Sequence, residues 1–458
     1  MIENDAFKLL LINLFHLNPD DIANILCTTF NKMMVLVVTL ADKHQACPYC
    51  GFTAPKIKEY VTKEITHSAL TTQKCIIKYR ARRYKCSCCG KTYYEFNPFV
   101  FKSQKISILT VHNILKDLKD FNETFTSVAR RYHVSPTSVS TIFDKHVDIG
   151  RNPLPEIINF DEVYAFKSEK SKYVCVLLDF KKQIPVDVLP NRKKEYLLNY
   201  FQKIPLEERK KVKYACSDMY EVYRDVVHKV FPSCCMLLDY FHLSQDFHRK
   251  MNEVRIKVMK GYKDNKASDE YYLLKKFNWL LFKNPEDEDK YGRLFDVERE
   301  RKYNSHFKSY MNYYDLRKKL LEINNDLTIC YSLKLELVDF YSKSTIDNAK
   351  VNLENLIRSC IDTNIEEMIK FSNNLINWKQ EIINSFTIVD TEYKVEADKG
   401  QVVVCNKKVN NAIIENRNKI IKCIKNNANG YTNWSRFRNR VMYVLDPNAT
   451  FSLEPREK

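Results

Sequence analysis

The sequence predicts a multidomain α+β protein with a β-rich head, a pair of short helices, and an α/β domain that contains a large all-α insertion. Two C-x-x-C-G segments within the first 90 residues predict the head. A change from helical to strand-like periodicity after Pro153 predicts the α/β domain. Long helical patterns between Asp239 and Glu415 predict the insertion. A chain of 458 residues is also too long for one compact core, so two to four domains are expected.

The overall charge points to a polyanionic partner. Lys and Arg number 74 and Asp and Glu number 57, which gives a net charge of +17. Nucleic acid is the partner such a surplus favours, although a generally basic surface would have the same composition. A hydrophobic content of 45% excludes a disordered chain.

The cysteines and the N-terminus indicate a reducing compartment. The 15 cysteines are scattered singly rather than spaced as a disulfide framework. The first residues, "MIENDAFKLLLINLFHL", carry acids where a signal peptide needs basic residues, and no apolar run approaches a membrane span. We therefore expect a cytoplasmic protein with no membrane partner.

The paired cysteines predict a structural zinc site in a head spanning residues 1–100. "CPYCG" (47–51) and "CSCCG" (86–90) each offer two thiolates followed by a glycine that tolerates positive φ in a sharp turn. Together they supply a tetrahedral Zn²⁺ set: Cys47, Cys50, Cys86 and Cys89. Cys88 could replace Cys89, and His44 is a weaker rival. Small buried cysteines or a redox pair are the alternatives.

A basic strand adjoins these cysteines. The segment from Lys74 to Lys91, "KCIIKYRARRYKCSCCGK", contains no acid and alternates as a strand does. It predicts phosphate contacts through Arg80, Arg82, Arg83 and Lys85. A solvated strand face is the alternative.

Residues 123–147, "ETFTSVARRYHVSPTSVSTIFDKHV", predict two short helices within a unit spanning residues 101–150. Ser135 is a suitable N-cap and Pro136 suits the first helical position. The two helices have the spacing of a helix-turn-helix, or of an ordinary helical hairpin. In the first case the DNA contacts would be made by Thr137, Ser138 and Thr141, with Arg130 and Arg131 nearby.

Strands and helices then follow in a mixed α/β order, with acids at strand ends. Strands are expected within 156–163, 173–180, 184–190, 211–220 and 233–243, the last ending on Asp239, with helices after the third and fourth. Asp161 would close the first strand and Asp218 the fourth. If these strands are neighbours, the two carboxylates meet at one sheet edge and suit Mg²⁺ or Mn²⁺. Asp239 and Glu162 are rival ligands, whereas Asp179 suggests a plain turn.

The C-terminal segment is the most specific feature. In "VNNAIIENRNKIIKCIKNNANGYTNWSRFRNRVMYVL" (409–445), a Glu is followed three residues later by Asn, then by a Lys-rich helix, a Gly-Tyr pair and an Arg-rich end. These features fall on Glu415, Asn418, Lys422, Gly430 and Tyr431, and the arginines Arg436, Arg438 and Arg440. With the cysteine pairs and the strand order, the chain over residues 45–445 resembles RNase-H-like DDE transposases of the ISL-three type.

This resemblance implies a third acid, a reaction and a partner. Glu415 would complete the Mg²⁺ site of an RNase-H-like domain at 154–445, with a helical insertion at 245–400 and a tail at 446–458. The activity implied is DNA cleavage and strand transfer at terminal inverted repeats by a DNA-bound homo-oligomer associated with the nucleoid. The family usually has Gly directly after this Glu, where this chain has Asn416.

The resemblance also covers an Asp-x-x-His motif and one face of the C-terminal helix. Asp239 and His242 match the motif and are interpreted as supporting the metal ligands or contacting DNA. Asn418, Lys419 and Lys422 share a helix face with Glu415 and would track phosphates, although a solvated face has the same pattern. Arg436 and Arg438 are further predicted DNA contacts. A non-catalytic DNA-binding protein and a junction nuclease are the alternative functions.

Overall fold

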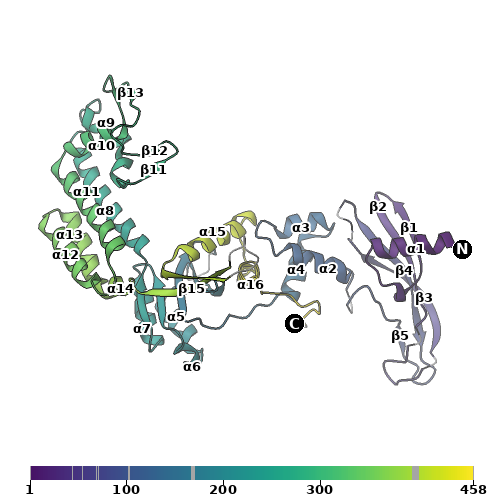
Figure 1. Cartoon of the computed structure of the whole chain (residues 1–458). Helices are drawn as coiled ribbons and strands as arrows, with labels where there is room; N and C mark the ends of the chain where they lie inside the picture. The colour runs from purple at the N-terminus through teal and green to yellow at the C-terminus, as the bar shows by residue number, and fades with distance from the viewer. Residues whose placement is uncertain are drawn as a thin grey trace.

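The computed structural model describes residues 2–43, 45–53, 55–68, 70, 72–101, 104–166, 171–394 and 402–456. Its parts lie in a row (Figure 1). A β-rich head with the N-terminus lies at one end, and a helical arm lies at the other. A mixed sheet and the C-terminal helices lie between them, next to a small helical unit.

The head is a sheet covered by the N-terminal helix. Its elements are α1 (Ile2–Leu14), the 3₁₀ turn η1 (Pro19–Asp21), β1 (Ile22–Phe30), β2 (Met33–Leu40), β3 (Lys56–Thr66), β4 (Cys75–Lys85) and β5 (Thr92–Tyr94). The sheet order is β1-β2-β4-β3, and β5 pairs with β4. Strand β4 confirms the alternation expected from sequence, because Ile77, Tyr79 and Ala81 are buried while Arg80 is exposed between them.

The helical unit consists of α2 (Ile108–Asp117), α3 (Phe125–Arg131) and α4 (Pro136–His146). The predicted start of α4 is confirmed, since the Ser135 side chain accepts from the Ser138 N–H and Pro136 opens the helix. At the start of α3, Thr124 and Ser127 form a reciprocal capping box. These caps fix both helix starts around a short connection in which His133 has φ 54°.

The central sheet has the order β10-β9-β6-β7-β8. Its strands are β6 (Ile157–Val163), β7 (Val174–Asp179), β8 (Pro185–Leu189), β9 (Tyr214–Ser217) and β10 (Cys235–Leu238). β7 is antiparallel to β6 and β8, whereas β9 is parallel to β6 and β10. The strand and helix order expected after Pro153 is thus found.

Helices cover both faces of the central sheet. On one face lie α5 (Lys194–Gln202) and α7 (Glu221–Val230), which share a core with Ile158 and Phe160 of β6; the short α6 (Leu206–Arg209) lies between them in sequence. On the other face lie α15 (Ala412–Asn427) and α16 (Trp434–Leu445), which pack on Val163 and the alternate residues of β7. Because side chains alternate along a strand, Asp161 belongs to the face covered by α15.

The helical arm, residues 240–384, starts directly after β10. Its helices are α8 (Tyr240–Lys260), α9 (Asp269–Lys276), the 3₁₀ helix η2 (Asn278–Phe282), α10 (Tyr313–Glu322), α11 (Asn325–Lys343), α12 (Ala349–Asp362), α13 (Glu366–Asn377) and α14 (Lys379–Asn384). They enclose a hydrophobic core of their own.

The expectation of an all-α insertion is wrong in part, because several short strands occur within it. Two hairpins lie near the end of the arm: β11 (Glu288–Asp289) with β12 (Gly292–Arg293), and β13 (Lys302–Asn304) with β14 (Ser309–Met311). After α14 the chain forms β15 (Ile388–Lys394) and β16 (Val402–Lys408), which pair antiparallel. None of the described helices is both long and apolar enough to cross a membrane.

Ion pairs join α16 to the helical unit. Arg436 donates through Nε and Nη2 to the two carboxylate oxygens of Asp144 in α4, at 2.9 and 2.6 Å. Arg440 is 1% exposed and donates to the backbone carbonyls of Asp120 and Glu123, both at 2.8 Å. These bonds connect the unit beside the central sheet to the last helix of the chain.

We expect Arg436→Ala to destabilise this junction by about 1–3 kcal/mol, because it removes a two-point, partly buried ion pair and leaves Asp144 without its partner. Urea unfolding followed by tryptophan fluorescence reports on it, since Trp434 starts α16. Lys343→Ala is the matched control. It breaks an exposed pair with Asp339 on one helix and should change stability by less than about 0.5 kcal/mol. Equal effects of the two changes would contradict the structural role of Arg436.

Candidate functional site

Asp161 and Asp218 lie on neighbouring parallel strands. The register pairs Ile157 with Tyr214 and Asn159 with Cys216, so two further residues bring Asp161 beside Asp218. Asp218 follows β9 directly, as expected. Asp161 does not close β6, as the sequence had suggested, but lies inside it, because the strand continues to Val163.

Burial disfavours the ionised form of both carboxyl groups. Desolvation raises the pKa of Asp161 to about 7, and the nearby charge of Asp218 acts in the same direction. Desolvation raises the pKa of Asp218 to about 6, and the charge of Glu162 adds to it. Two acids held this way repel each other unless protons or a cation neutralise them.

Helix α15 packs against β6 on the face of the sheet that carries Asp161. The side-chain amide of Asn418 donates to Asp161 Oδ2 at 2.7 Å, and Asn418 is only 5% exposed. Asn411, at the N-cap of α15, donates to the Phe160 carbonyl and accepts from the Asn159 amide at 2.7 Å. The helix is therefore fixed to β6 by buried amides, and Glu415 lies one turn before Asn418 on the same face.

Asp239, His242 and Glu415 come together at the start of α8. Asp239 is the N-cap residue of this helix, and His242 follows in its first turn. His242 Nε2 lies 3.8 Å from Asp239 Oδ2 and 3.9 Å from Glu415 Oε1. One potential ligand atom from each of the three residues lies within 4.8 Å of the others. Asp239 and His242 therefore lie beside Glu415.

We call these five residues, Asp161, Asp218, Asp239, His242 and Glu415, the acidic centre. Several buried atoms in and beside it have no hydrogen-bond partner among the described residues: Asp218 Oδ1, Asp239 Oδ2, His242 Nε2 and Asn418 Oδ1. Buried polar atoms are normally paired, so their concentration at one place indicates a site shaped for an added group. Oxygen-rich ligand sets of this kind fit divalent cations.

Glu162, the adjacent acid, has partners outside the acidic centre. It pairs with Arg192 and accepts from the Tyr223 hydroxyl at 3.2 Å, on the α7 side of the sheet. The Arg192 guanidinium lies 4.7 Å from the ring centres of both Tyr173 and Tyr220. This arrangement argues against Glu162 as a metal ligand.

Asp179, the remaining strand-end acid, accepts from the backbone N–H groups of Lys181 and Lys182 at 2.9 and 3.0 Å. This is the plain turn that the sequence suggested, and it lies apart from the acidic centre.

In metal-free protein we expect stability to fall as pH rises from about 4 to about 7. The folded pKa values of Asp161 and Asp218 lie above the ordinary value of 3.8, so the folded chain binds more protons than the unfolded chain in this range. One pKa unit corresponds to about 1.4 kcal/mol. Ionisation of the two carboxyl groups therefore lowers the free energy of unfolding by a few kcal/mol across this pH range. Melting temperatures measured from pH 4 to 8 should show a smaller fall for Asp161→Asn. If the melting temperature of Asp161→Asn falls with pH as steeply as that of the wild type, the raised pKa of Asp161 would be contradicted.

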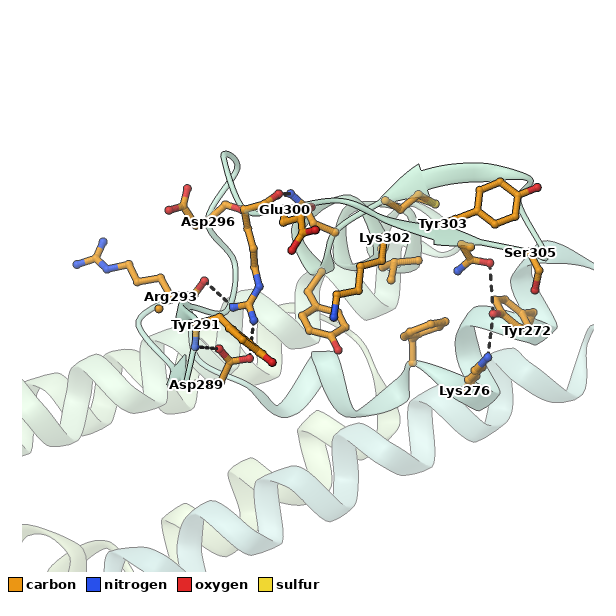
Figure 2. Close-up of a pocket in the computed structure, with 18 residues that line it drawn as sticks. Tyr272, Lys276, Asp289, Tyr291, Arg293, Asp296, Glu300, Lys302, Tyr303 and Ser305 are labelled. Atoms are coloured by element: carbon orange, nitrogen blue, oxygen red, sulfur yellow. Dashed lines mark hydrogen bonds and ion pairs between the residues drawn. The ribbon is translucent and has the colours of Figure 1, made fainter.

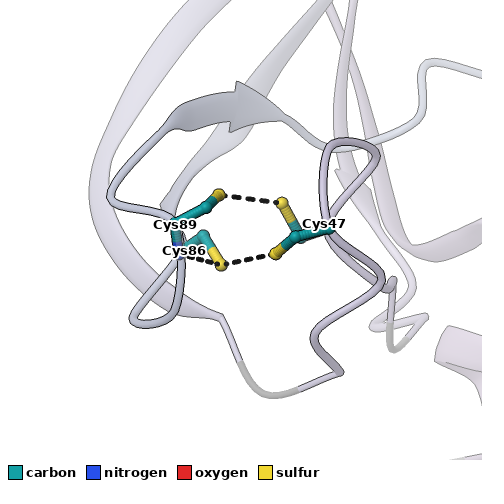
Figure 3. A group of neighbouring side chains, drawn as sticks. Cys47, Cys86 and Cys89 are labelled. Carbon is teal, nitrogen blue, oxygen red and sulfur yellow. Dashed lines mark hydrogen bonds between the residues drawn. The ribbon is translucent and has the colours of Figure 1, made fainter.

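The four predicted zinc ligands form a cluster (Figure 3). The Sγ atoms of Cys47 and Cys89 lie 3.7 Å apart, and those of Cys50 and Cys86 lie 3.5 Å apart. Thiolates about 2.3 Å from one zinc ion in a tetrahedron are separated by about 3.8 Å, so the cluster fits Zn²⁺.

The turns around the cluster have the expected backbone. Gly51 and Gly90 have φ of +74° and +67°, and their N–H groups donate to the carbonyls of Cys47 and Cys86. Backbone N–H donation from Cys89 lowers the pKa of Cys86 to about 7, whereas the pKa values of Cys50 and Cys89 are raised. Cys88 is exposed and outside the cluster, and His44 lies outside the described residues.

Several predicted DNA contacts are used inside the molecule. Arg82 pairs with the buried Glu95 at 2.8 Å and donates to the Leu40 carbonyl. Arg131 pairs with Asp117 and Glu123. The structure therefore gives these two arginines a role in holding the fold.

The same holds for part of the C-terminal segment. Arg436 binds Asp144, Arg438 binds Asp187 at 2.6 Å, and Asn418 binds Asp161. These contacts engage Arg436, Arg438 and Asn418 within the fold, and their role as DNA contacts stays a prediction.

Other predicted contacts remain accessible. Arg83 pairs with the exposed Glu59 on the strand surface and is half-buried, as is Ser138. The remaining residues are exposed: Arg80, Lys85, Arg130, Thr137, Thr141, Lys419 and Lys422.

A cavity of about 670 Å³ in the helical arm is lined by residues between Tyr272 and Leu316 (Figure 2). Its lining is polar and aromatic. Arg299 pairs with Asp289 at 2.5 Å, and Lys276 donates to the Tyr272 hydroxyl. None of the residues that line the cavity belongs to the acidic centre, so this cavity is not the candidate site.

Sequence reasoning missed the network around the acidic centre. The bond from Asn418 to Asp161 and the amide pair Asn159–Asn411 join residues more than 250 positions apart. The pair Arg192–Glu162 was also missed. A clustering of Asn at the start of the C-terminal helix, "VNNAIIENRN", was the one available signal for buried amides.

Comparison with known proteins gives two findings. The model of the ISL-three-type (ISL3) DDE family, described as transposase, matches residues 158–397, more than half of the chain. The chain is also 19% identical over 409 residues to the "Transposase for insertion sequence element IS1001" of Bordetella parapertussis. That similarity covers 89% of this chain and 90% of the relative.

Proposed function

The chain belongs to the ISL-three-type family of DDE transposases, and from this premise we propose that it cuts and joins DNA at the ends of its own insertion sequence. Asp161, Asp218 and Glu415 would hold two Mg²⁺ or Mn²⁺ ions. The observation that carries the proposal is that Asp161 and Asp218 lie side by side on neighbouring strands, while Glu415 lies 3.9 Å from His242, whose charge acts on both aspartates.

The topology supports an RNase-H-like catalytic domain. An antiparallel β6-β7-β8 followed by parallel β9 and β10 places the ends of β6 and β9 side by side. Helix α15, which Asn411 and Asn418 fix to β6, would bring Glu415 toward these two acids. The third acid lies beyond the matched residues 158–397, so its role rests on the geometry and on the tail resemblance.

The reaction consists of two in-line displacements. Bound divalent ions would activate the attacking oxygen and stabilise the leaving oxygen. Water first attacks the phosphodiester at the element end, which releases a 3′-hydroxyl and leaves a 5′-phosphate. That 3′-hydroxyl then attacks a target phosphodiester, forms the new bond and displaces the 3′-oxygen of the target strand. The carboxylates hold the cations, while Asn418 fixes the orientation of Asp161.

The head and the helical unit would select the DNA. The basic strand beside the cysteine cluster would contact the terminal inverted repeats through the exposed Arg80 and Lys85. Helices α3 and α4 would act as a helix-turn-helix and contact them through the exposed Arg130, Thr137 and Thr141. Lys419 and Lys422 lie on α15 close to Glu415 and would contact the phosphates of the cleaved strand. Because two element ends must be joined, a DNA-bound homo-oligomer is expected.

Cleavage of a labelled element end tests the proposal. The end is identified from the genomic flanks of the coding sequence, and wild-type protein is incubated with it in Mg²⁺, in Mn²⁺ and in EDTA. We expect a nick with a 3′-hydroxyl at the element boundary that EDTA abolishes. Specific binding without a nick in either metal would favour a non-catalytic DNA-binding protein derived from a transposase.

A further inference from the structure

We propose that Asp239, His242 and Glu415 bind a divalent transition-metal ion directly, with His242 supplying a nitrogen ligand. The proposal rests on the proposed function only in that Glu415 is shared with the Mg²⁺ site. It adds an imidazole to a site otherwise composed of oxygen ligands. It also changes the role of the Asp-x-x-His segment from support to ligation.

The distances are the first argument. At 3.8 and 3.9 Å, His242 Nε2 is too far from Asp239 Oδ2 and Glu415 Oε1 for hydrogen bonds. Two ligands on one ion, each about 2.1–2.2 Å away, lie about 3.0–4.3 Å apart depending on their angle. The separations therefore fit atoms that share an ion better than atoms that bond to each other.

The second argument is that the facing atoms have no other partner. Asp239 is 3% exposed, and both its Oδ2 and His242 Nε2 are buried without a hydrogen-bond partner among the described residues. An unpaired buried carboxylate oxygen is costly, and a cation between the groups would satisfy it.

The third argument is how the residues are supported. Asp239 and His242 are separated by one helical turn at the start of α8, so they face the same side. Glu415 reaches them from the first turn of α15, which buried amides fix to β6. Three ligand atoms from two anchored helix starts form a preorganised site.

The ligand chemistry indicates the class of ion. Imidazole together with carboxylates suits Mn²⁺, Fe²⁺ or Zn²⁺, whereas Mg²⁺ prefers oxygen ligands only. We therefore expect this position to bind Mn²⁺ more tightly than Mg²⁺.

Pulsed electron paramagnetic resonance of Mn²⁺ bound to the untagged full chain tests the proposal. A ¹⁴N modulation from a coordinated imidazole is expected in the wild type and should disappear in His242→Gln. His248→Gln is the matched control, because His248 lies on the same helix and packs against Phe282 instead. Zinc at the cysteine cluster is diamagnetic and does not contribute. Titration should also show Mn²⁺ affinity reduced at least tenfold in His242→Gln only.

The outcomes separate this inference from the proposed function. Bound Mn²⁺ without a nitrogen signal, or a signal that persists in His242→Gln, would overturn the ligand role of His242. DNA cleavage in Mg²⁺ would in that case leave the proposed function standing. A nitrogen signal that depends on His242, in a protein that cleaves no DNA with any metal, would support the metal site and contradict the proposed function.

Discussion

Replacing Asp161 or Asp218 by asparagine is expected to lower DNA-end cleavage on the order of a thousandfold or more, without loss of DNA binding. Asparagine keeps the volume of the side chain but removes the charge that holds a cation. Both variants should fold, because burial already disfavours the charged form of each carboxyl group and asparagine is neutral. In the absence of metal their melting temperatures should equal or exceed that of the wild type near pH 7.

Asp179→Asn is the matched control for this prediction. Asp179 is also a buried acid at a strand end, 7% exposed, but its oxygen accepts from turn N–H groups and lies away from the acidic centre. It should cleave DNA at close to the wild-type rate. Cleavage is measured on a labelled element end, and binding is measured separately by gel shift. More than about a tenth of wild-type cleavage in Asp161→Asn would remove Asp161 from the site.

Replacing Cys86 by serine is expected to release zinc, to unfold the part of the head around the cysteine cluster and to reduce DNA binding by at least tenfold. A structural zinc site contributes on the order of 10 kcal/mol of binding free energy to folding. Tyr84 and Tyr93 pack against Cys47 and Cys86 in a small hydrophobic cluster, so loss of the metal would also disturb this packing.

Zinc content by atomic absorption, together with a gel shift, checks this second prediction. Cys88→Ser is the control, because Cys88 is exposed one residue before Cys89 and contributes no sulfur to the cluster. It should retain one zinc per chain and full binding. Zinc loss in Cys88→Ser rather than in a Cys89→Ser variant would reverse the choice of the fourth ligand.

The local features of the fold could be predicted from the sequence because they depend on neighbouring residues. The Ser135-Pro136 start of α4, the alternation of β4 and the glycines that end both cysteine turns are set by short-range preferences. The strands of the central sheet were also visible, since each is a short apolar run. Their ends were less certain, and Asp161 lies inside β6 because residues up to Val163 still pair with β7.

The roles of the arginines could not be predicted, because their partners come from distant parts of the chain. Arg436 meets Asp144 and Arg438 meets Asp187 only after α16 packs against the helical unit and β8. Periodicity shows that a residue is on a helix but not which acid faces it. The same reason hid the bond from Asn418 to Asp161 and the contact of His242 with Glu415.

The short hairpins of the helical arm were missed for a different reason. Strands of two or three residues, such as β11 and β13, are too short to show a period. They occur in the charged segment after η2, which reads as a loop.

Strand transfer by the full chain reports on whether the acidic centre joins DNA. A precleaved element end with a labelled 3′-hydroxyl is incubated with the full chain, a plasmid target and Mg²⁺. We expect wild-type protein to join the labelled end covalently to the plasmid, and Asp218→Asn and Glu415→Gln to give no joined product. Asn416→Gln, the adjacent exposed residue, should join normally. If wild-type protein binds the end and leaves the plasmid unjoined, or if Glu415→Gln joins as well as the wild type, the acidic centre is not the site of DNA transfer.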